Sequence, residues 1–494
     1  MDIETVVALL TEVEIPTEQP RKAEFAFDNP IHNRMPTSSI LDAISNVLVS
    51  KSRGEVIAVG LQQPTVGGIY TFVIASNGVI PNSTLEHARD LVADLQSLGS
   101  DFAEFRTGVG EDDNIQANNN TSVSEGELER ASSPWMDETK FPIHLKTMVA
   151  TFRAKICLFA LPKIKQRLQK PWGGTTRGQS FVDLVENLPS NSQHRELQII
   201  QDIYFIIRWM LRLFQIHPHQ LPEEEIKQFV KGMTHIGVVV DELLQIKNWT
   251  AEIFRSSPFM PGFPLARFLK KMASTSNSTD TLLKYAYSPR LYRRYLNRTK
   301  ICILPLTNTP RKIPLPDSHH WHQISRTILA NNGEASLPDD LSQAESPGST
   351  LRKRFEGKQS ITGLVHCECL IALHLARGNQ LGAQSIPYIG VSKLSCLACW
   401  EFLKSLRSAG YVFYTRGSHA KAYFPWKYPD LEIEQAGLPS EKKSNIFNSL
   451  LSSLSDVYTE RLQIRERNRR LSDSSTEGVS GMTHEPVSID LFKF

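Results

Sequence analysis

The densest pattern in the chain lies between residues 364 and 417, where short apolar helices and strands alternate. Apolar residues at helical spacing predict helices over 364–376 and 396–410. The runs IPYIGVSK (386–393) and YVFYTRG (411–417) are β-branched and aromatic, which is typical of strands. Helices and strands that alternate in this way pack in layers, so we expect an α/β structure here.

Four of the six cysteines fall inside this segment. We expect the remaining two, Cys157 and Cys302, to be core residues because they sit in apolar runs. Cys396-x-x-Cys399 places two thiolates on one helical face at a helix start, where the helix dipole favours the thiolate form. Taken alone, this spacing also fits a redox pair or half of a structural zinc site.

A second helix start carries His366 and Glu368, about 30 residues before Cys396. Helix starts that follow adjacent strands can meet at one edge of a sheet, which would bring an imidazole, two thiolates and a carboxylate together. Three nitrogen and sulfur ligands leave a fourth position for water, as a catalytic zinc requires. We therefore predict His366, Cys396 and Cys399 as ligands of Zn2+ and Glu368 as the catalytic proton carrier.

H-x-E followed after about 30 residues by C-x-x-C, on successive helix starts, resembles the zinc-dependent cytidine deaminase-like superfamily. The runs VHCECLIALHL, YIGVSKLSCLACWEFL and GSHAKAYFPWKYP are similar to fungal proteins grouped with bacterial toxin-type nucleic acid deaminases, a family related to one predicted in Orientia. The resemblance covers about 70 of the 494 residues well.

That resemblance implies a three-layer α/β/α deaminase-like domain with a mixed sheet. It also implies a zinc-dependent hydrolytic deaminase, a hydrolase of C–N bonds in a cyclic amidine. A zinc-bound hydroxide would attack the amino-bearing carbon of a nucleobase, with Glu368 as proton shuttle. The expected partner is a nucleobase-containing substrate, either a free nucleoside or nucleotide or a single-stranded nucleic acid, and the sequence leaves the base open.

Two positions depart from the resemblance. The superfamily usually has proline before the first cysteine, where this chain has Ser395, a good N-cap that should preserve the helix start. Ala420 stands in GSHAKAY where the fungal relatives often carry glycine. Ser395, His419 and Lys421 are the candidate substrate-binding residues.

The alternative is a closed structural site. Cys369 follows His366 by three positions, on the same helical face, and would complete a His-Cys₃ tetrahedron with Cys396 and Cys399. The domain would then be a catalytically inactive, zinc-stabilised interaction module. We favour the open site because Glu368 matches the deaminase arrangement and Cys369 begins an apolar run.

The remaining chain predicts a small N-terminal α/β unit, in which the runs 55–63 and 69–78 form a first hairpin. Helical periodicity predicts an all-helical domain before the deaminase-like domain, with segments around 141–169, 180–187, 193–216 and 223–248. A closing helix is expected over 440–470.

A Ser/Thr/Asn-rich break at 273–281 separates the helical domain from an Arg- and Tyr-rich stretch at 285–300. The runs 300–306 and 311–316 then suggest a second hairpin, and a helix is expected after it at about 319–330. The expected divisions are a small α/β unit (1–107), an acidic Asn/Ser-rich linker (108–138), the helical domain (139–272), the deaminase-like domain (283–435), and a closing helix with a disordered tail (436–494).

Charge does not identify a partner, because a formal charge of +3 is small for a chain of this size. The Arg- and Tyr-rich stretch 285–300 could bind a nucleic acid, but we favour a helix whose tyrosines pack inward. The apolar stretch 197–216 contains charged residues, so we expect a buried helix and no membrane. Without a visible secretory leader, we expect an intracellular protein, cytoplasmic or nuclear. The role of the helical domain, including the building of a homo-oligomer, stays open.

Overall fold

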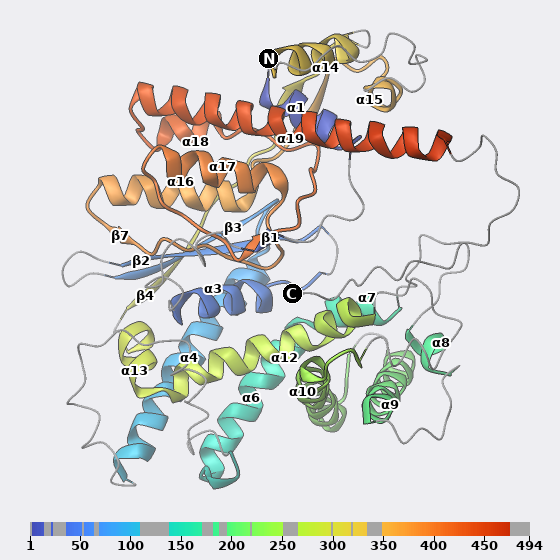
Figure 1. Cartoon of the computed structure of the whole chain (residues 1–494). Helices are drawn as coiled ribbons and strands as arrows, with labels where there is room; N and C mark the ends of the chain where they lie inside the picture. Colours follow the sequence, from blue (N-terminus) through green and yellow to red (C-terminus); the bar gives the residue numbers. More distant parts are fainter. Residues whose placement is uncertain are drawn as a thin grey trace, which may run out of the picture.

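The computed structural model describes most of the chain. The described residues are 2–13, 21–22, 36–51, 54–63, 69–108, 138–169, 181–186, 195–217, 220–249, 265–297, 300–317, 320–332 and 348–474. Of the predicted linker only the two end residues are described, and the chain after residue 474 lies outside this part. The described chain is mixed α/β (Figure 1).

A mixed sheet of five strands lies at the centre of the molecule. Strands β2 (Ile57–Gln63) and β3 (Tyr70–Ser76) pair antiparallel, which confirms the predicted first hairpin. Strand β4 (Ile301–Pro305) runs parallel to β3. The short strands β7 (Gln384–Ser385) and β8 (Gly390–Val391) both pair antiparallel with β2.

The pairing of these strands brings together parts of the chain that the sequence analysis assigned to different domains. The hairpin of residues 1–107 forms the middle of the sheet that β4, β7 and β8 complete. The pairing is determined by backbone hydrogen bonds between strands that are far apart in the sequence. A local sequence pattern cannot predict which distant strands will pair. The N-terminal hairpin therefore belongs structurally with the segment that carries the candidate site.

Helices cover both faces of the sheet. Helices α16 (Cys367–Gln380) and α17 (Leu397–Ser408) lie above it in Figure 1, and α3 (Pro36–Val47) and α4 (Asn82–Gly108) lie below. Gly60 permits close approach of α16, because a Cβ atom there would lie 2.7 Å from Ile371 Cγ2. The helix that carries His366 at its start is thus packed directly on the central strand.

The predicted second hairpin is wrong. Its first run is β4, in the main sheet, whereas β5 (Arg311–Pro314) pairs antiparallel with β6 (Ser360–Gly363). The helix expected after it is confirmed as α14 (His320–Asn331). The strand expected at 411–417 reduces to an isolated bridge at Tyr414 and to β9 (Gly417–Ser418), which pairs with β1 (Arg21–Lys22).

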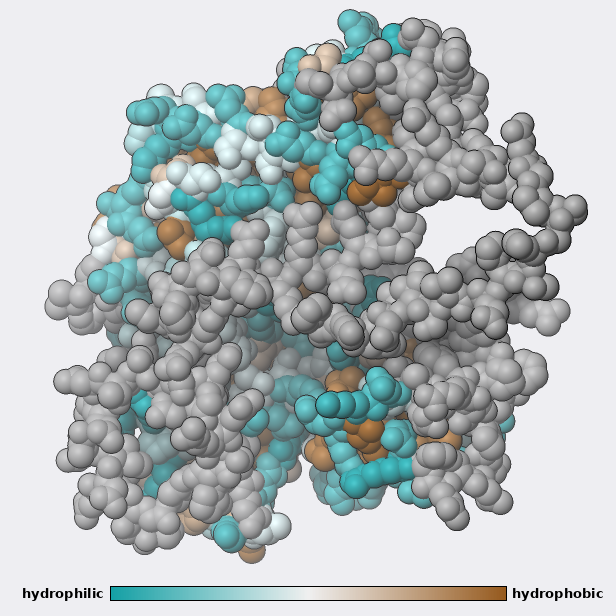
Figure 2. Space-filling view, viewed as in Figure 1, coloured by the Kyte–Doolittle hydropathy of each residue, from teal (hydrophilic) through white to brown (hydrophobic). Residues whose placement is uncertain are grey.

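The helical segments predicted between 141 and 248 are confirmed. They are α6 (Ile143–Phe159), α7 (Leu161–Gln169), α8 (Phe181–Glu186), α9 (Arg195–Ile216) and α10 (Glu223–Gln245), preceded by the short helix η5 (Glu138–Lys140). No described helix is long and apolar enough to cross a membrane. On the face drawn in Figure 2, much of the described surface is hydrophilic, with hydrophobic residues in smaller groups.

The predicted break at 273–281 is also wrong, because it lies within α12 (Leu265–Tyr287). Three of its small polar residues, Thr275, Ser276 and Thr279, are buried, and neighbouring helices approach closely here. A Cβ atom on Gly237 of α10 would lie 2.6 Å from Ser276 Oγ. Asn46 Nδ2 of α3 donates to Ser274 O at 2.8 Å. The proposed boundary between the helical and deaminase-like ranges therefore falls inside a helix.

The Arg- and Tyr-rich stretch continues from α12 through α13 (Pro289–Leu291) and η6 (Tyr292–Leu296). All its tyrosines are buried, which confirms that they pack inward; they are Tyr285, Tyr287, Tyr292 and Tyr295. Cys157 is buried as expected, but Cys302 is exposed.

The last two helices of the described chain, α18 (Asp430–Gln435) and α19 (Ser440–Ser474), pack against α16 and α17. The long α19 confirms the closing helix predicted over 440–470 and packs on α17 and on α1 (Ile3–Leu10). The short helices α15 (Ser349–Arg354) and α18 complete this side.

Candidate functional site

Two helix starts meet at one place, as the sequence predicted. His366 is the N-cap of α16 and Cys396 is the N-cap of α17. His366 Nδ1 lies 3.5 Å from Cys396 Sγ and 3.3 Å from Cys399 Sγ. Their ligand atoms all lie within 4.8 Å of one another, so these three residues could hold one metal ion.

Glu368 lies beside this group. It is 3 % exposed, and its Oε2 accepts hydrogen bonds from the thiols of Cys367, at 3.4 Å, and Cys399, at 3.8 Å. A carboxylate next to a metal site that is not itself one of the grouped ligands is placed to move a proton. Cys367 is therefore a hydrogen-bond donor to Glu368.

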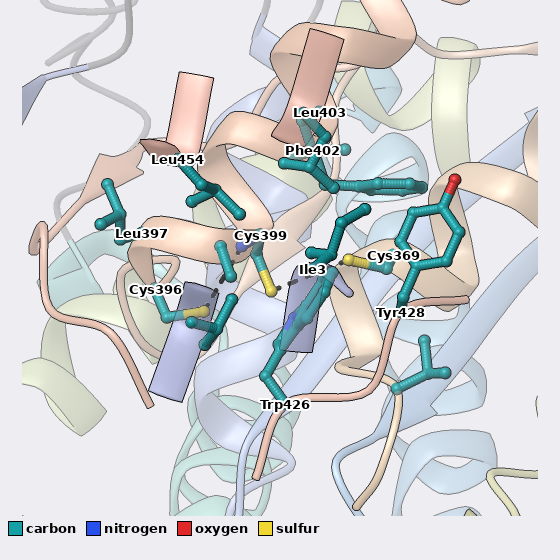
Figure 3. Close-up of a cluster of buried hydrophobic side chains, with 14 of the residues drawn as sticks. Ile3, Cys369, Cys396, Leu397, Cys399, Phe402, Leu403, Trp426, Tyr428 and Leu454 are labelled. Carbon is teal, nitrogen blue, oxygen red and sulfur yellow. Dashed lines mark hydrogen bonds between the residues drawn. The ribbon is translucent and has the colours of Figure 1, made fainter. Parts of the chain in front are cut away.

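Cys369 also lies near the group. Its Sγ is 3.8 Å from Cys399 Sγ, and Figure 3 shows the two sulfur atoms directed toward each other. Ile3 and Trp426 lie close by in the same apolar cluster. Cys369 is not among the grouped ligands His366, Cys396 and Cys399.

The donor chemistry fits zinc. Burial raises the pKa of the Cys396 and Cys399 thiols well above the usual range. Burial also lowers the pKa of His366, but the adjacent Cys396 and Glu368 together raise it by more, so the net shift of this pKa is upward. Buried thiolates need a nearby cation, and one imidazole with two thiolates is a ligand set that zinc accepts.

The start of α16 is held by a residue that sequence reasoning missed. Asn77, directly after β3, accepts a hydrogen bond at its Oδ1 from Cys367 N at 2.8 Å. Asn308 Nδ2 donates to Ser76 O at 3.0 Å and to Val365 O at 2.7 Å. These two amides tie the end of β3 to the residues around His366. An asparagine after an apolar strand was the one signal, and it is also typical of an ordinary turn.

The start of α17 is held by local contacts. Cys399 N donates to Cys396 Sγ at 3.4 Å. Ser395 is fully buried: its N–H donates to Gly417 O at 3.0 Å, and its hydroxyl lies 3.0 Å from Thr415 Oγ1. Ser395 therefore connects the α17 start to the segment at 415–418.

The segment GSHAKAY lies against the same helix start. His419 N donates to Ser395 O at 3.2 Å, and Leu397 N donates to Lys421 O at 2.9 Å. Between them, Ala420 has a φ of 57°, in the left-handed region that favours glycine. This φ is compatible with the glycine that the resemblance leads one to expect at this position. His419 is partly buried and Lys421 is exposed.

The arrangement is that of a candidate metal centre with a buried carboxylate beside it. A model of the OTT_1508-like deaminase family, which is a cytidine deaminase-like family, matches residues 365–430. The matched range contains the three grouped ligands, Glu368 and the GSHAKAY segment, so the resemblance expected from the sequence is confirmed. No curated protein and no solved structure matches the chain.

Proposed function

We propose that the chain is a zinc-dependent hydrolytic deaminase of a nucleobase, with His366, Cys396 and Cys399 as the zinc ligands. One observation carries the proposal: the ligand atoms of these residues lie within 4.8 Å of one another, at two helix starts inside the segment matched by the deaminase family. The sheet with helices on both faces supports the three-layer α/β/α arrangement that we propose for this domain.

When bound, zinc supplies the Lewis acidity that makes water nucleophilic near neutral pH. Glu368 takes the proton from the attacking water and returns it to the amino group, which leaves as ammonia. The base thus exchanges its amino group for a carbonyl oxygen. Cys367 donates a hydrogen bond to Glu368, and Asn77 fixes the Cys367 backbone, so the carboxylate is held in position.

The surroundings of Glu368 suit this chemistry. The carboxyl group lies at the start of α16, where backbone N–H groups favour negative charge. Its burial keeps bulk water from competing for the transferred proton. We place substrate contacts at His419 and Lys421, because their segment packs on the start of α17. We infer that the hydroxyl of Ser395 serves the fold, since it is buried and paired with Thr415.

The direct test is ammonia release by the purified full chain, assayed on cytosine and adenine compounds as nucleosides, nucleotides and single-stranded oligonucleotides. Glu368→Ala should lower the rate at least about 100-fold and retain its zinc. Glu460→Ala, which removes an exposed carboxylate on α19, is the matched control and should leave the rate unchanged. Ammonia release that persists in the zinc-loaded Glu368→Ala protein would contradict the assignment.

A closed structural zinc site is the second candidate, favoured by the 3.8 Å separation of Cys369 Sγ and Cys399 Sγ. Zinc analysis of Cys369→Ser separates the two. The deaminase proposal expects about one zinc per chain in this variant, as in the wild type. Loss of zinc from Cys369→Ser, together with a Glu368→Ala variant that changes no measured property, would establish the structural site instead.

A further inference from the structure

Residues 417–427, which we call the bridging segment, lie against both helix starts that carry the proposed metal ligands. The N–H group of Leu397, which follows the first cysteine ligand, donates to Lys421 O at 2.9 Å. Near the other end, Lys427 N donates to Leu364 O at 3.0 Å, two residues before the histidine ligand. The part of the segment between these two hydrogen bonds therefore runs from one ligand-bearing helix start to the other.

Burial alternates along the bridging segment with a period of two residues, as in an extended chain. The side chains on one side are buried; they are Ala420, Ala422, Phe424 and Trp426. The side chains on the other side lie at the surface, with Lys421, Tyr423 and Pro425 exposed and His419 partly buried. A ligand that approaches the candidate site over this segment therefore meets an imidazole, an ammonium group and a phenol ring.

Tyr423 presents its ring on this surface. The residue is 50 % exposed, and its ring makes a T-shaped contact with the ring of His419, with centroids 5.2 Å apart and an angle of 89° between the planes. An edge-to-face contact of this kind orients a ring and covers at most one of its faces. The exposed part of the Tyr423 ring can therefore stack on a nucleobase.

His419 and Lys421 supply hydrogen-bond donors on the same side of the segment. Lys421 N donates to His419 Nδ1 at 3.1 Å, so the neutral imidazole carries its proton on Nε2. This N–H group and the exposed ammonium group of Lys421 are both suited to phosphate oxygens. Residues 416–427 contain no acidic residue that would repel a phosphate. The bridging segment thus combines a stacking ring with two groups that can bind a phosphodiester.

The depth of the candidate site separates a reacting base from this surface. A base that reacts must approach Glu368, which is 3 % exposed, and so leaves the surface. Tyr423 lies at the surface, so a base that stacks on its ring is a second base. A nucleoside or mononucleotide has only one base, whereas a nucleic acid strand has neighbouring bases. Bases in a duplex are already stacked and paired, which favours a single strand.

We propose that the substrate is a single-stranded nucleic acid, that Tyr423 stacks on a base next to the reacting base, and that His419 and Lys421 bind the adjoining phosphates. This inference rests on the proposed deaminase function and narrows its substrate class. It also adds Tyr423 to the residues that select the substrate.

Binding to the Glu368→Ala chain tests the inference without turnover. The probes are a fluorescent single strand of about 12 nucleotides with alternating cytosine and adenine, as DNA and as RNA, and the corresponding 5′-monophosphates. The salt concentration is fixed at about 0.1 M, because phosphate contacts weaken with salt. One of the two strands should bind at least about tenfold more tightly than any monophosphate, and the tighter strand identifies the sugar.

Variants at Tyr423 separate stacking from support of the fold. Tyr423→Ala removes the ring and should weaken strand binding at least about fivefold, with no change for the monophosphates. Tyr423→Phe keeps the ring and should stay within about twofold of the parent chain. Tyr423→Leu keeps an apolar side chain without a ring, so it should resemble Tyr423→Ala and replaces it if the alanine variant folds poorly.

Phe205→Ala is the matched control. Phe205 is a ring on α9 that is 64 % exposed and makes a T-shaped contact with Tyr204, with centroids 5.4 Å apart. Its removal should leave every affinity unchanged. The inference is overturned by monophosphates that bind as tightly as both strands, by a Tyr423→Leu chain that binds the strand as well as Tyr423→Phe does, by an equal loss in Phe205→Ala, or by no binding of any probe.

Because the readout is binding, the two proposals fail separately. Strand binding that depends on the Tyr423 ring, with no ammonia release from any base, rejects the deaminase and keeps the strand-binding surface. Ammonia release from nucleosides, with no binding of either strand, rejects this inference and keeps the deaminase.

Discussion

The two helices that meet at the candidate metal site begin in different ways. The first backbone N–H of α16, at Cys367, is capped from outside by Asn77, which lies 290 residues earlier in the chain. The start of α17 is capped from within, because Cys396 Sγ accepts from Cys399 N. The α16 start depends on a residue that follows a strand of the sheet, and the α17 start depends on the proposed metal ligands themselves. The site can therefore be disrupted in two physically distinct ways: by loss of the Asn77 cap at α16 or by loss of the Cys396 cap at α17.

The largest effect should come from the α17 start, where one residue is both cap and proposed ligand. Cys396→Ala removes a thiolate and the group that accepts from Cys399 N, so bound zinc should fall from about one per chain to nearly none. Metal analysis after gel filtration measures this, with Cys302→Ala, which changes an exposed cysteine, as the control. Full zinc retention in Cys396→Ala would remove Cys396 from the ligand set.

The next effect concerns the residue before that start. Ser395→Pro deletes the N–H that donates to Gly417 O and the hydroxyl paired with Thr415, and should cost roughly 2–4 kcal/mol in the free energy of unfolding. Ser395→Ala loses only the hydroxyl and should cost about 1 kcal/mol. Denaturant unfolding of both variants tests whether the proline that is usual in the superfamily is incompatible with this backbone. Equal free energies of unfolding for Ser395→Pro and Ser395→Ala would show that the hydrogen bond from Ser395 N to Gly417 O contributes nothing to stability.

A smaller effect is expected at the α16 start. Asn77→Ala leaves Cys367 N without its acceptor and should lower the free energy of unfolding by about 1–2 kcal/mol. Asn77→Asp keeps an acceptor and adds a negative charge at the positive end of the helix, so it should be near the wild type in stability. If Asn77→Ala and Asn77→Asp unfold alike, the outside cap is not what stabilises this start.

The same contrast explains which parts of the site the sequence could predict. The grouping of His366, Cys396 and Cys399 follows from residue types, spacing and helix starts, all of which are local signals. Asn77 could not be found, because its role depends on strand β3 ending next to Cys367, a contact between distant segments. Ser395 is a predicted substrate contact, but its hydroxyl is buried against Thr415, and only the tertiary structure brings that partner close.

The fold shows the same contrast: elements with local sequence signals were predicted, and features that depend on distant contacts were not. The apolar periodicity predicted α6, α9, α10, α16 and α17 well, since each buries one face of a regular helix. The Ser/Thr/Asn-rich run at 273–281 has little helix propensity, yet tight packing against α10 makes small residues necessary there. Similarly, the β-rich runs at 300–316 suggested one hairpin because neighbouring strands usually pair, but each run found a partner elsewhere.

The smallest expected effect lies at Ala420, in the segment that packs on the α17 start. Its left-handed φ of 57° costs an alanine about 1–2 kcal/mol, which glycine would relieve. Against this, glycine loses a buried methyl group worth about 0.8 kcal/mol and gains about 0.5–1 kcal/mol of backbone entropy in the unfolded chain. These terms nearly cancel, so Ala420→Gly should change the free energy of unfolding by less than about 1 kcal/mol.

Ala420→Val sharpens that last prediction. A β-branched side chain is strained at positive φ, and the site is 2 % exposed, so the valine variant should lose more than about 2 kcal/mol. Denaturant unfolding at fixed zinc concentration compares the three proteins. Similar stabilities for the alanine and valine chains would mean that the backbone at residue 420 relaxes to negative φ, and that the hydrogen bond from Arg461 Nη2 of α19 to Ala420 O does not fix this backbone.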